Sequence, residues 1–174
     1  MITFWQRVDH FVRHLAPFAT TVLLVVLNAI PLPIPDYRTI VPLIPLMAIY
    51  YWAIYRPDLM PVLAVFFVGL LNDVLSGATL GFNAFLFLAT HGIVRSQRRF
   101  VQGHGFFVVW AVFVMIVAGV GGVSWLVATI LYRHAVPSAP AVAQLALTLA
   151  MFPFVAWILL KVQRTFLMSH ETMR

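Results

Sequence analysis

The chain has no cysteine and only five acidic residues among its 174 positions. Without cysteine, disulfides, palmitoylated or prenylated anchors and thiolate metal sites are all excluded. The sequence also has no Ser, His and acid constellation, no paired carboxylates, no phosphate-binding glycine loop and no metal-ligand spacing. These absences predict a protein that is not an enzyme and that carries neither metal nor cofactor.

Charged residues of both signs make up only 9% of the sequence, whereas 63% is hydrophobic and the mean hydropathy is +0.98. A soluble domain would have too little polar surface to face water, so the composition predicts an all-α integral membrane protein. The length admits six spans in one compact bundle and leaves no room for an extramembrane domain. The expected spans are approximately 15–35, 40–55, 59–75, 80–94, 106–132 and 140–160.

The segments that flank this six-helix membrane domain, which covers residues 15–162, are polar. Apolar residues of 1–14 recur at helical spacing among Arg7, Asp9, His10 and Arg13, which predicts an amphipathic segment lying at the membrane interface. Residues 163–174 form a polar tail. The aromatic residues Tyr50, Tyr51, Trp52 and Tyr55 precede Arg56 and are interpreted as an interfacial belt that marks a membrane boundary.

Basic residues follow the alternation of the expected spans. Nine Lys and Arg fall in the termini, the turn at 56–58 and the loop 95–105, against two in the other connections. The positive-inside rule therefore places both termini in the cytoplasm. The net charge of +6 is explained by this topology and gives no indication of nucleic-acid binding. The cluster Arg95, Arg98 and Arg99 is mainly a topogenic signal, with an anionic lipid or a cytoplasmic partner as the alternative role.

The segment 69–81 contains Asp73, an acid without a basic neighbour near the end of an apolar helix. A carboxylate at this depth needs a partner or a hydrated site. One interpretation is a contact with a partner helix or a lipid. The alternative is structural, with the carboxylate hydrated or accepting hydrogen bonds from the backbone of Ser76 and Gly77.

Other candidate residues lie around Asp73. Asn72, Asn83 and His91 are candidate partner or ligand contacts, and a polar cavity formed with Asp73 is one hypothesis, although bonds between neighbouring helices are the simpler one. Small residues permit close helix approach, within the chain or with a partner. The candidates for this packing are Gly69, Gly77, Gly81, Ala118 and Gly122.

Two runs resemble motifs of the bacterial rod-shape protein family MreD. They are Tyr51-Trp52-Ala53-Ile54-Tyr55-Arg56-Pro57 and Gly69-Leu70-Leu71-Asn72-Asp73-Val74-Leu75-Ser76-Gly77, with Leu80-Gly81 following. The resemblance implies a multi-pass protein of the bacterial inner (cytoplasmic) membrane that belongs to the elongasome, which builds lateral-wall peptidoglycan. It implies association with the bitopic protein MreC and, indirectly, with RodA, penicillin-binding protein 2 and MreB. It also implies a fold resembling the substrate-binding subunit of energy-coupling-factor transporters.

These observations lead to a hypothesis and an alternative. The chain is expected to be a non-catalytic scaffold that binds an MreC-like helix and membrane lipids, with the outer half of the third and fourth spans as the expected docking site. The alternative is the substrate-binding membrane subunit of a small-molecule, vitamin-type importer, motivated by the cavity of Asp73, Asn83 and His91.

Overall fold

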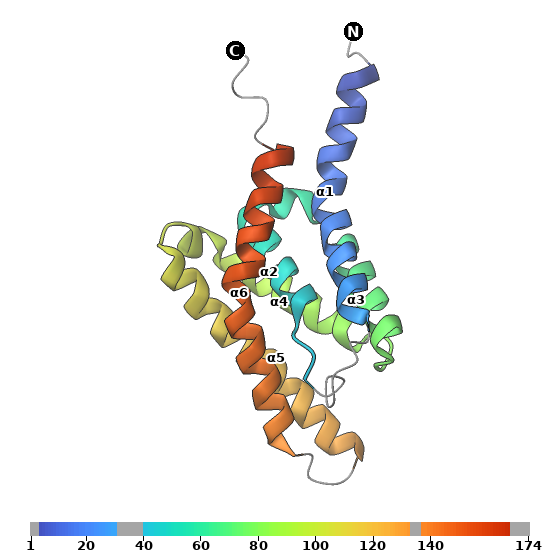
Figure 1. Ribbon diagram of the computed structural model, residues 1–174, viewed down its shortest axis with the longest axis vertical. Helices are drawn as coiled ribbons and strands as arrows, with labels where there is room; N and C mark the ends of the chain where they lie inside the picture. The colour runs from blue at the N-terminus through green and yellow to red at the C-terminus, as the bar shows by residue number, and fades with distance from the viewer. Residues whose placement is uncertain (1–3, 31–39, 133–136, 168–174) are drawn as a thin grey trace.

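The computed structural model describes residues 4–30, 40–132 and 137–167. Within these ranges the chain is helical and contains no strand. The elements are α1 (Phe4–Ala29), α2 (Ile44–Tyr55), a 3-10 turn η2 (Pro57–Leu59), α3 (Val62–Ser76), α4 (Phe82–Gln102), α5 (Phe106–Tyr132) and α6 (Ser138–Leu167). Figure 1 shows that the chain reverses direction between successive helices, so that α1 begins and α6 ends at the same end of the molecule.

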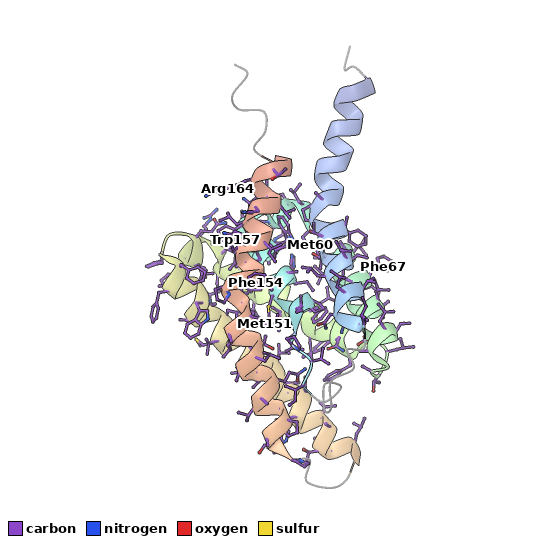
Figure 2. The ribbon with its side chains drawn as sticks, viewed as in Figure 1. Met60, Phe67, Met151, Phe154, Trp157 and Arg164 are labelled. Atoms are coloured by element: carbon purple, nitrogen blue, oxygen red, sulfur yellow. The ribbon has the colours of Figure 1, made fainter. Side chains whose placement is uncertain are left out.

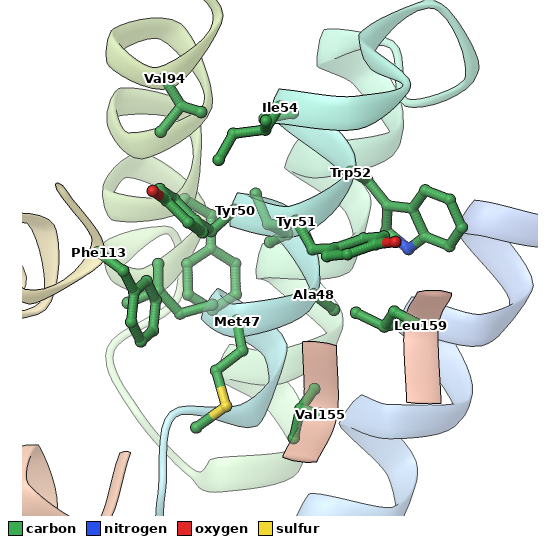
Figure 3. Close-up of a cluster of buried hydrophobic side chains, with 14 of the residues drawn as sticks. Met47, Ala48, Tyr50, Tyr51, Trp52, Ile54, Val94, Phe113, Val155 and Leu159 are labelled. Carbon is green, nitrogen blue, oxygen red and sulfur yellow. The ribbon is translucent and has the colours of Figure 1, made fainter. Parts of the chain in front are cut away.

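Helix α2 forms the centre of the bundle. Its residues from Pro45 to Ile54 are all buried, which agrees with a segment that is apolar on every side. Figure 3 shows Tyr50 and Trp52 leaving α2 on opposite sides, the first toward Phe113 of α5 and the second toward α1. The short second span predicted by the sequence is therefore a core helix, surrounded by its neighbours.

The prediction that four aromatic residues of α2 form an interfacial belt is wrong for three of them. Tyr50, Tyr51 and Trp52 are buried, and only Tyr55 is exposed. The Tyr50 hydroxyl donates a hydrogen bond to the Val109 carbonyl oxygen at 2.7 Å. Neighbouring helices cover all three rings and accept hydrogen bonds from the hydroxyls of Tyr50 and Tyr51, whereas the buried Trp52 Nε1–H has no partner among the described residues. The rings therefore do not lie at the surface as interfacial side chains do.

Large apolar side chains of the helices around α2 face outward. Phe67 of α3 lies at the outer edge of the molecule in Figure 2, whereas Met60 lies between the helices and is fully buried. Phe67 and Phe154 are more than half exposed. Large apolar side chains that face outward in this number suit a lipid surrounding, because hydrocarbon solvates them as well as a protein core does.

Three helices end at the same place. The Gln102 side-chain amide at the end of α4 donates to the Ile54 carbonyl oxygen near the end of α2. The Tyr51 hydroxyl donates to Gln163 Oε1 of α6 at 2.9 Å. These contacts bring together the basic residues that follow or end the three helices, namely Arg56, Arg95, Arg98, Arg99, Lys161 and Arg164.

Helix boundaries differ from the sequence prediction at several points. α1 runs without interruption through residue 14, where a separate interfacial segment is expected to end. α4 continues to Gln102, eight residues beyond the predicted end at Val94. α5 is one unbroken helix from Phe106 to Tyr132. The predicted end of the first span at residue 35 and the end of the tail lie outside the described residues.

Two of the described helices are long and apolar enough to cross a membrane. They are Phe106–Leu131 of α5 and Ser138–Thr165 of α6. Three further apolar stretches are shorter and belong to α1, α2 and α3. α4 carries Arg95, Arg98 and Arg99 within its length, so its average hydropathy is lower than that of α5 and α6.

Candidate functional site

Asp73, fully buried near the end of α3, binds the beginning of α4. Its Oδ2 accepts a hydrogen bond from the Gly81 backbone N–H at 2.8 Å. Its Oδ1 accepts from the Asn83 backbone N–H at 3.0 Å and from the Asn83 side-chain amide at 2.8 Å. The Ala84 N–H lies 3.4 Å from Oδ2. The carboxylate therefore caps α4 from a neighbouring helix, where free N–H groups and the positive end of the helix dipole favour an anion.

The turn between α3 and α4 makes this capping geometry accessible. Gly77 ends α3 in the left-handed region, with φ of 68°, and Gly81 precedes α4 with φ of 90°. These conformations favour glycine, because a Cβ would clash with the backbone there. The chain can thus reverse within a few residues and return the first N–H groups of α4 to the Asp73 carboxylate.

Gly69 holds the two helices together one turn before Asp73. A Cβ at this position would lie 2.3 Å from the Ala84 Cα and 2.8 Å from the Ala84 backbone nitrogen. The close approach fixes α3 against the same residue whose N–H faces Asp73. Gly69 and Asp73 therefore act on one helix pair, and the structure assigns Gly69 to packing within the chain.

The polar residues predicted to surround Asp73 are only partly brought together. Asn83 binds it directly, whereas the backbone carbonyl of the half-buried Asn72 accepts a hydrogen bond from the Ser76 hydroxyl. His91 is buried two turns further along α4, about 12 Å from Asn83 along the helix axis. The donors to Asp73 are those of α4 and not those of Ser76 and Gly77. The three residues Asp73, Asn83 and His91 thus do not form one cavity.

A groove that sequence reasoning missed lies between α4 and α5. Its volume is about 560 Å³, and its lining is apolar apart from Thr90 and Gln97. On α4 it extends from Leu86 to Val101, a length of about 22 Å. Exposed members include Met115 of α5, with 75% of its surface accessible. The groove is therefore a surface feature long enough to hold an extended apolar partner.

The groove could be foreseen only in part. The sequence predicts close helix approach at Ala118 and Gly122 of α5, and both are exposed in the structure, with open space around Gly122. The residue that lines the groove is the neighbouring Gly119, and a Cβ added there would meet no other atom. The spacing of the small residues indicates that a partner helix can approach α5 closely. That α5 forms a groove together with α4 depends on tertiary packing.

The basic cluster extends along the last turns of α4. Arg95 and Arg99 are exposed and Arg98 is half-buried, and all three belong to the helix and not to the predicted loop. The three arginines therefore lie on the same turns of α4 as Gln97 and Val101 of the groove, without lining it. Among the residues that the structure describes, no group of three His, Asp or Glu side chains has metal-binding geometry.

The helices, the apolar exterior and the two long hydrophobic segments define an all-helical membrane protein. The particular family follows from a comparison with family models. The chain belongs to the MreD family, because the model of the rod shape-determining protein MreD matches residues 9–163. Neither a curated protein nor a solved structure matches the chain.

Family membership confirms the resemblance predicted from residues 51–57 and 69–81. It gives the chain a role in rod-shape determination and places it among components of the shape-determining machinery, which are not a known enzyme family. Asp73 and its turn lie within the matched region.

Proposed function

We propose that the chain is a non-catalytic scaffold of the elongasome that binds one membrane-crossing helix of an MreC-like protein in the groove between α4 and α5. Through that partner it acts on RodA, penicillin-binding protein 2 and MreB and helps to organise lateral peptidoglycan synthesis. The single observation that carries the location is the apolar groove, whose 22 Å length along α4 is most of a hydrocarbon core.

The chemistry of the groove supports a helix as its occupant. Gly119 has open space where a side chain would stand, so a partner backbone can approach α5 closely. Gln97 lines the same groove and supplies an amide that can hydrogen-bond across a helix interface. Close packing together with one or two polar contacts is how helices associate in hydrocarbon.

The groove between α4 and α5 replaces the docking site expected from the sequence, which was the outer half of the third and fourth spans. α3 and α4 already pack tightly on each other at Gly69 and Ala84, and Asp73 is occupied by α4. The glycine and the acid that were expected to receive a partner there are therefore used within the chain. The importer alternative is not proposed, because it was motivated by a cavity of Asp73, Asn83 and His91 that the structure does not form.

A six-span arrangement in the bacterial inner membrane is part of the same proposal. It comprises an interfacial start at 1–14, one six-helix domain over 15–162 with a fold resembling the transporter subunits named above, and a cytoplasmic tail at 163–174. The alternation of helix directions and the gathering of Arg56, Arg98 and Lys161 at one end support cytoplasmic termini.

Filling the groove is expected to prevent partner binding. Gly119→Phe places a ring where the structure has open space, so the chain should fold normally while recovery of a co-expressed MreC-like protein falls by about tenfold, comparable to loss of a well-packed contact. The measurement is affinity purification of the tagged chain in mild detergent, with quantitation of both proteins and of the monodisperse fraction.

Ala118→Phe is the matched control, because Ala118 is exposed on the same helix but does not line the groove. It should leave partner recovery unchanged. If Ala118→Phe abolishes recovery and Gly119→Phe does not, the partner packs on the face of Ala118 and Gly122 and the groove assignment is wrong.

Replacing Arg95, Arg98 and Arg99 by Ala is expected to reduce topological fidelity, because it removes three of the nine charges that favour retention of the 56–58 and 95–105 side in the cytoplasm. Reporters fused after α4 and after α6 measure the outcome. A mixed orientation is expected, and purely cytoplasmic labelling at both fusion points would show that the remaining charges suffice.

A further inference from the structure

We propose that the pocket between α2, α5 and α6 binds one anionic phospholipid, with its phosphate held by Lys161 and Arg164 and part of an acyl chain inserted among aromatic rings. The pocket has a volume of about 300 Å³ and is lined by residues that include Tyr51, Tyr55, Phe106, Phe152, Pro153 and Trp157. It is distinct from the groove between α4 and α5, with which it shares no lining residue.

The lining is built by ring packing from three helices. Phe152 stacks on Phe113 of α5 with ring centroids 4.1 Å apart, and it lies parallel to Phe106 at 6.3 Å. Tyr51 packs against Tyr55 at 4.7 Å. These contacts give the pocket fixed walls, and the walls are apolar, so hydrocarbon suits it better than water or a charged solute.

Two cations stand at the mouth of this pocket. Lys161 Nζ lies 4.1 Å above the centroid of Trp157, which lines the pocket. Arg164 directly follows Gln163, whose Oε1 accepts a hydrogen bond from the hydroxyl of Tyr51, another lining residue, at 2.9 Å. Figure 2 shows Trp157 and Arg164 on the same stretch of α6. Both cations are exposed, so their charged ends can reach a ligand that arrives from the membrane surface.

Nothing acidic competes for these cations among the side chains that the structure describes. Asp73 caps α4, and Asp58 lies exposed in η2. Neither acid forms an ion pair with Lys161 or Arg164. An apolar pocket with two cations at its edge, neither of them paired with a described acid, is complementary to an amphiphile with one anionic head. A phospholipid satisfies both halves, since each basic group near a membrane surface attracts anionic lipid.

Location along the helices agrees with this occupant. Tyr51 and Tyr55 lie in the last turns of α2, Phe106 begins α5, and Gln163 of α6 accepts a hydrogen bond from Tyr51. The pocket is therefore at the end of the bundle where the basic residues gather, at headgroup depth. The aromatic rings and the α6 cations then hold one lipid against the central helix α2.

The test is native mass spectrometry of the purified full-length chain with phosphatidylglycerol, and with phosphatidylcholine as the zwitterionic comparison. The wild-type chain should retain one phosphatidylglycerol preferentially. In the double variant Lys161→Gln and Arg164→Gln the affinity for that lipid should fall by about 25-fold, since each removed cation weakens attraction to an anionic lipid by roughly fivefold. Both side chains are exposed, so folding should be unaffected.

The matched control removes the same charge elsewhere, with Arg95→Gln and Arg99→Gln on α4. It should keep the adduct, and an equal loss in both double variants would overturn the proposal in favour of general surface charge. Ala156→Phe adds a ring inside the pocket without changing charge, and it should also reduce the adduct. Full retention by a monodisperse Ala156→Phe protein would show that no acyl chain enters the pocket.

Discussion

Asp73→Asn is expected to lower the free energy of unfolding by about 2 kcal/mol or more, because two backbone N–H groups at the start of α4 lose a charged acceptor and face an amide in its place. The buried carboxylate is the group that closes the α3 and α4 hairpin. The measurement is the temperature at which half of the detergent-purified protein leaves the monodisperse peak in size-exclusion chromatography.

Asp58→Asn is the matched control, since it makes the same chemical change at an exposed acid in η2. Its midpoint should equal that of the wild-type protein. A second outcome separates the two interpretations of Asp73: an unchanged midpoint together with lost recovery of the MreC-like protein would mean that the acid serves a partner, and that capping of α4 adds little.

Gly69→Ala should destabilise the chain by about 3 kcal/mol, because the new Cβ would meet the backbone of Ala84, which cannot rotate away as a flexible side chain can. α3 and α4 must then separate at the point where the Ala84 N–H faces Asp73. We therefore expect Gly69→Ala and Asp73→Asn to be non-additive, with the double variant less damaged than the sum of the two single changes.

Gly122→Ala tests this explanation within the same protein. Gly122 is exposed on α5 and has no atom within 4 Å of a built Cβ, so the substitution should be neutral or stabilise α5 by up to about 1 kcal/mol through helix propensity. Equal thermal midpoints for Gly69→Ala and Gly122→Ala would show that α3 and α4 can relax around the added methyl group.

The organising role of Asp73 was predictable because an unpaired acid in an apolar helix demands a partner. The identity of that partner was not, since the donors belong to the next helix, eight to eleven residues away, across a turn that depends on Gly77 and Gly81. Local alternatives such as the Ser76 and Gly77 backbone fit the sequence equally well, and only the return of α4 excludes them.

The misassignment of Tyr50, Tyr51 and Trp52 has a related origin. Aromatic residues beside an arginine fit a membrane interface and also fit a core helix whose end lies near the surface. The difference arises from α5 and α6, which supply the Val109 carbonyl and Gln163 as acceptors for the two tyrosines. The sequence around α2 does not indicate that α5 and α6 surround it.

The sequence by itself determined that the chain is helical, apolar and basic at alternate connections, that Asp73 is exceptional and that the chain resembles the MreD family. Tertiary structure decided which apolar faces are buried, because lipid and protein interior are equally apolar and hydropathy does not distinguish them. It thereby decided that Gly69 serves the α3 and α4 pair, that Gly119 opens onto a groove, and that the aromatic end of α2 forms a pocket.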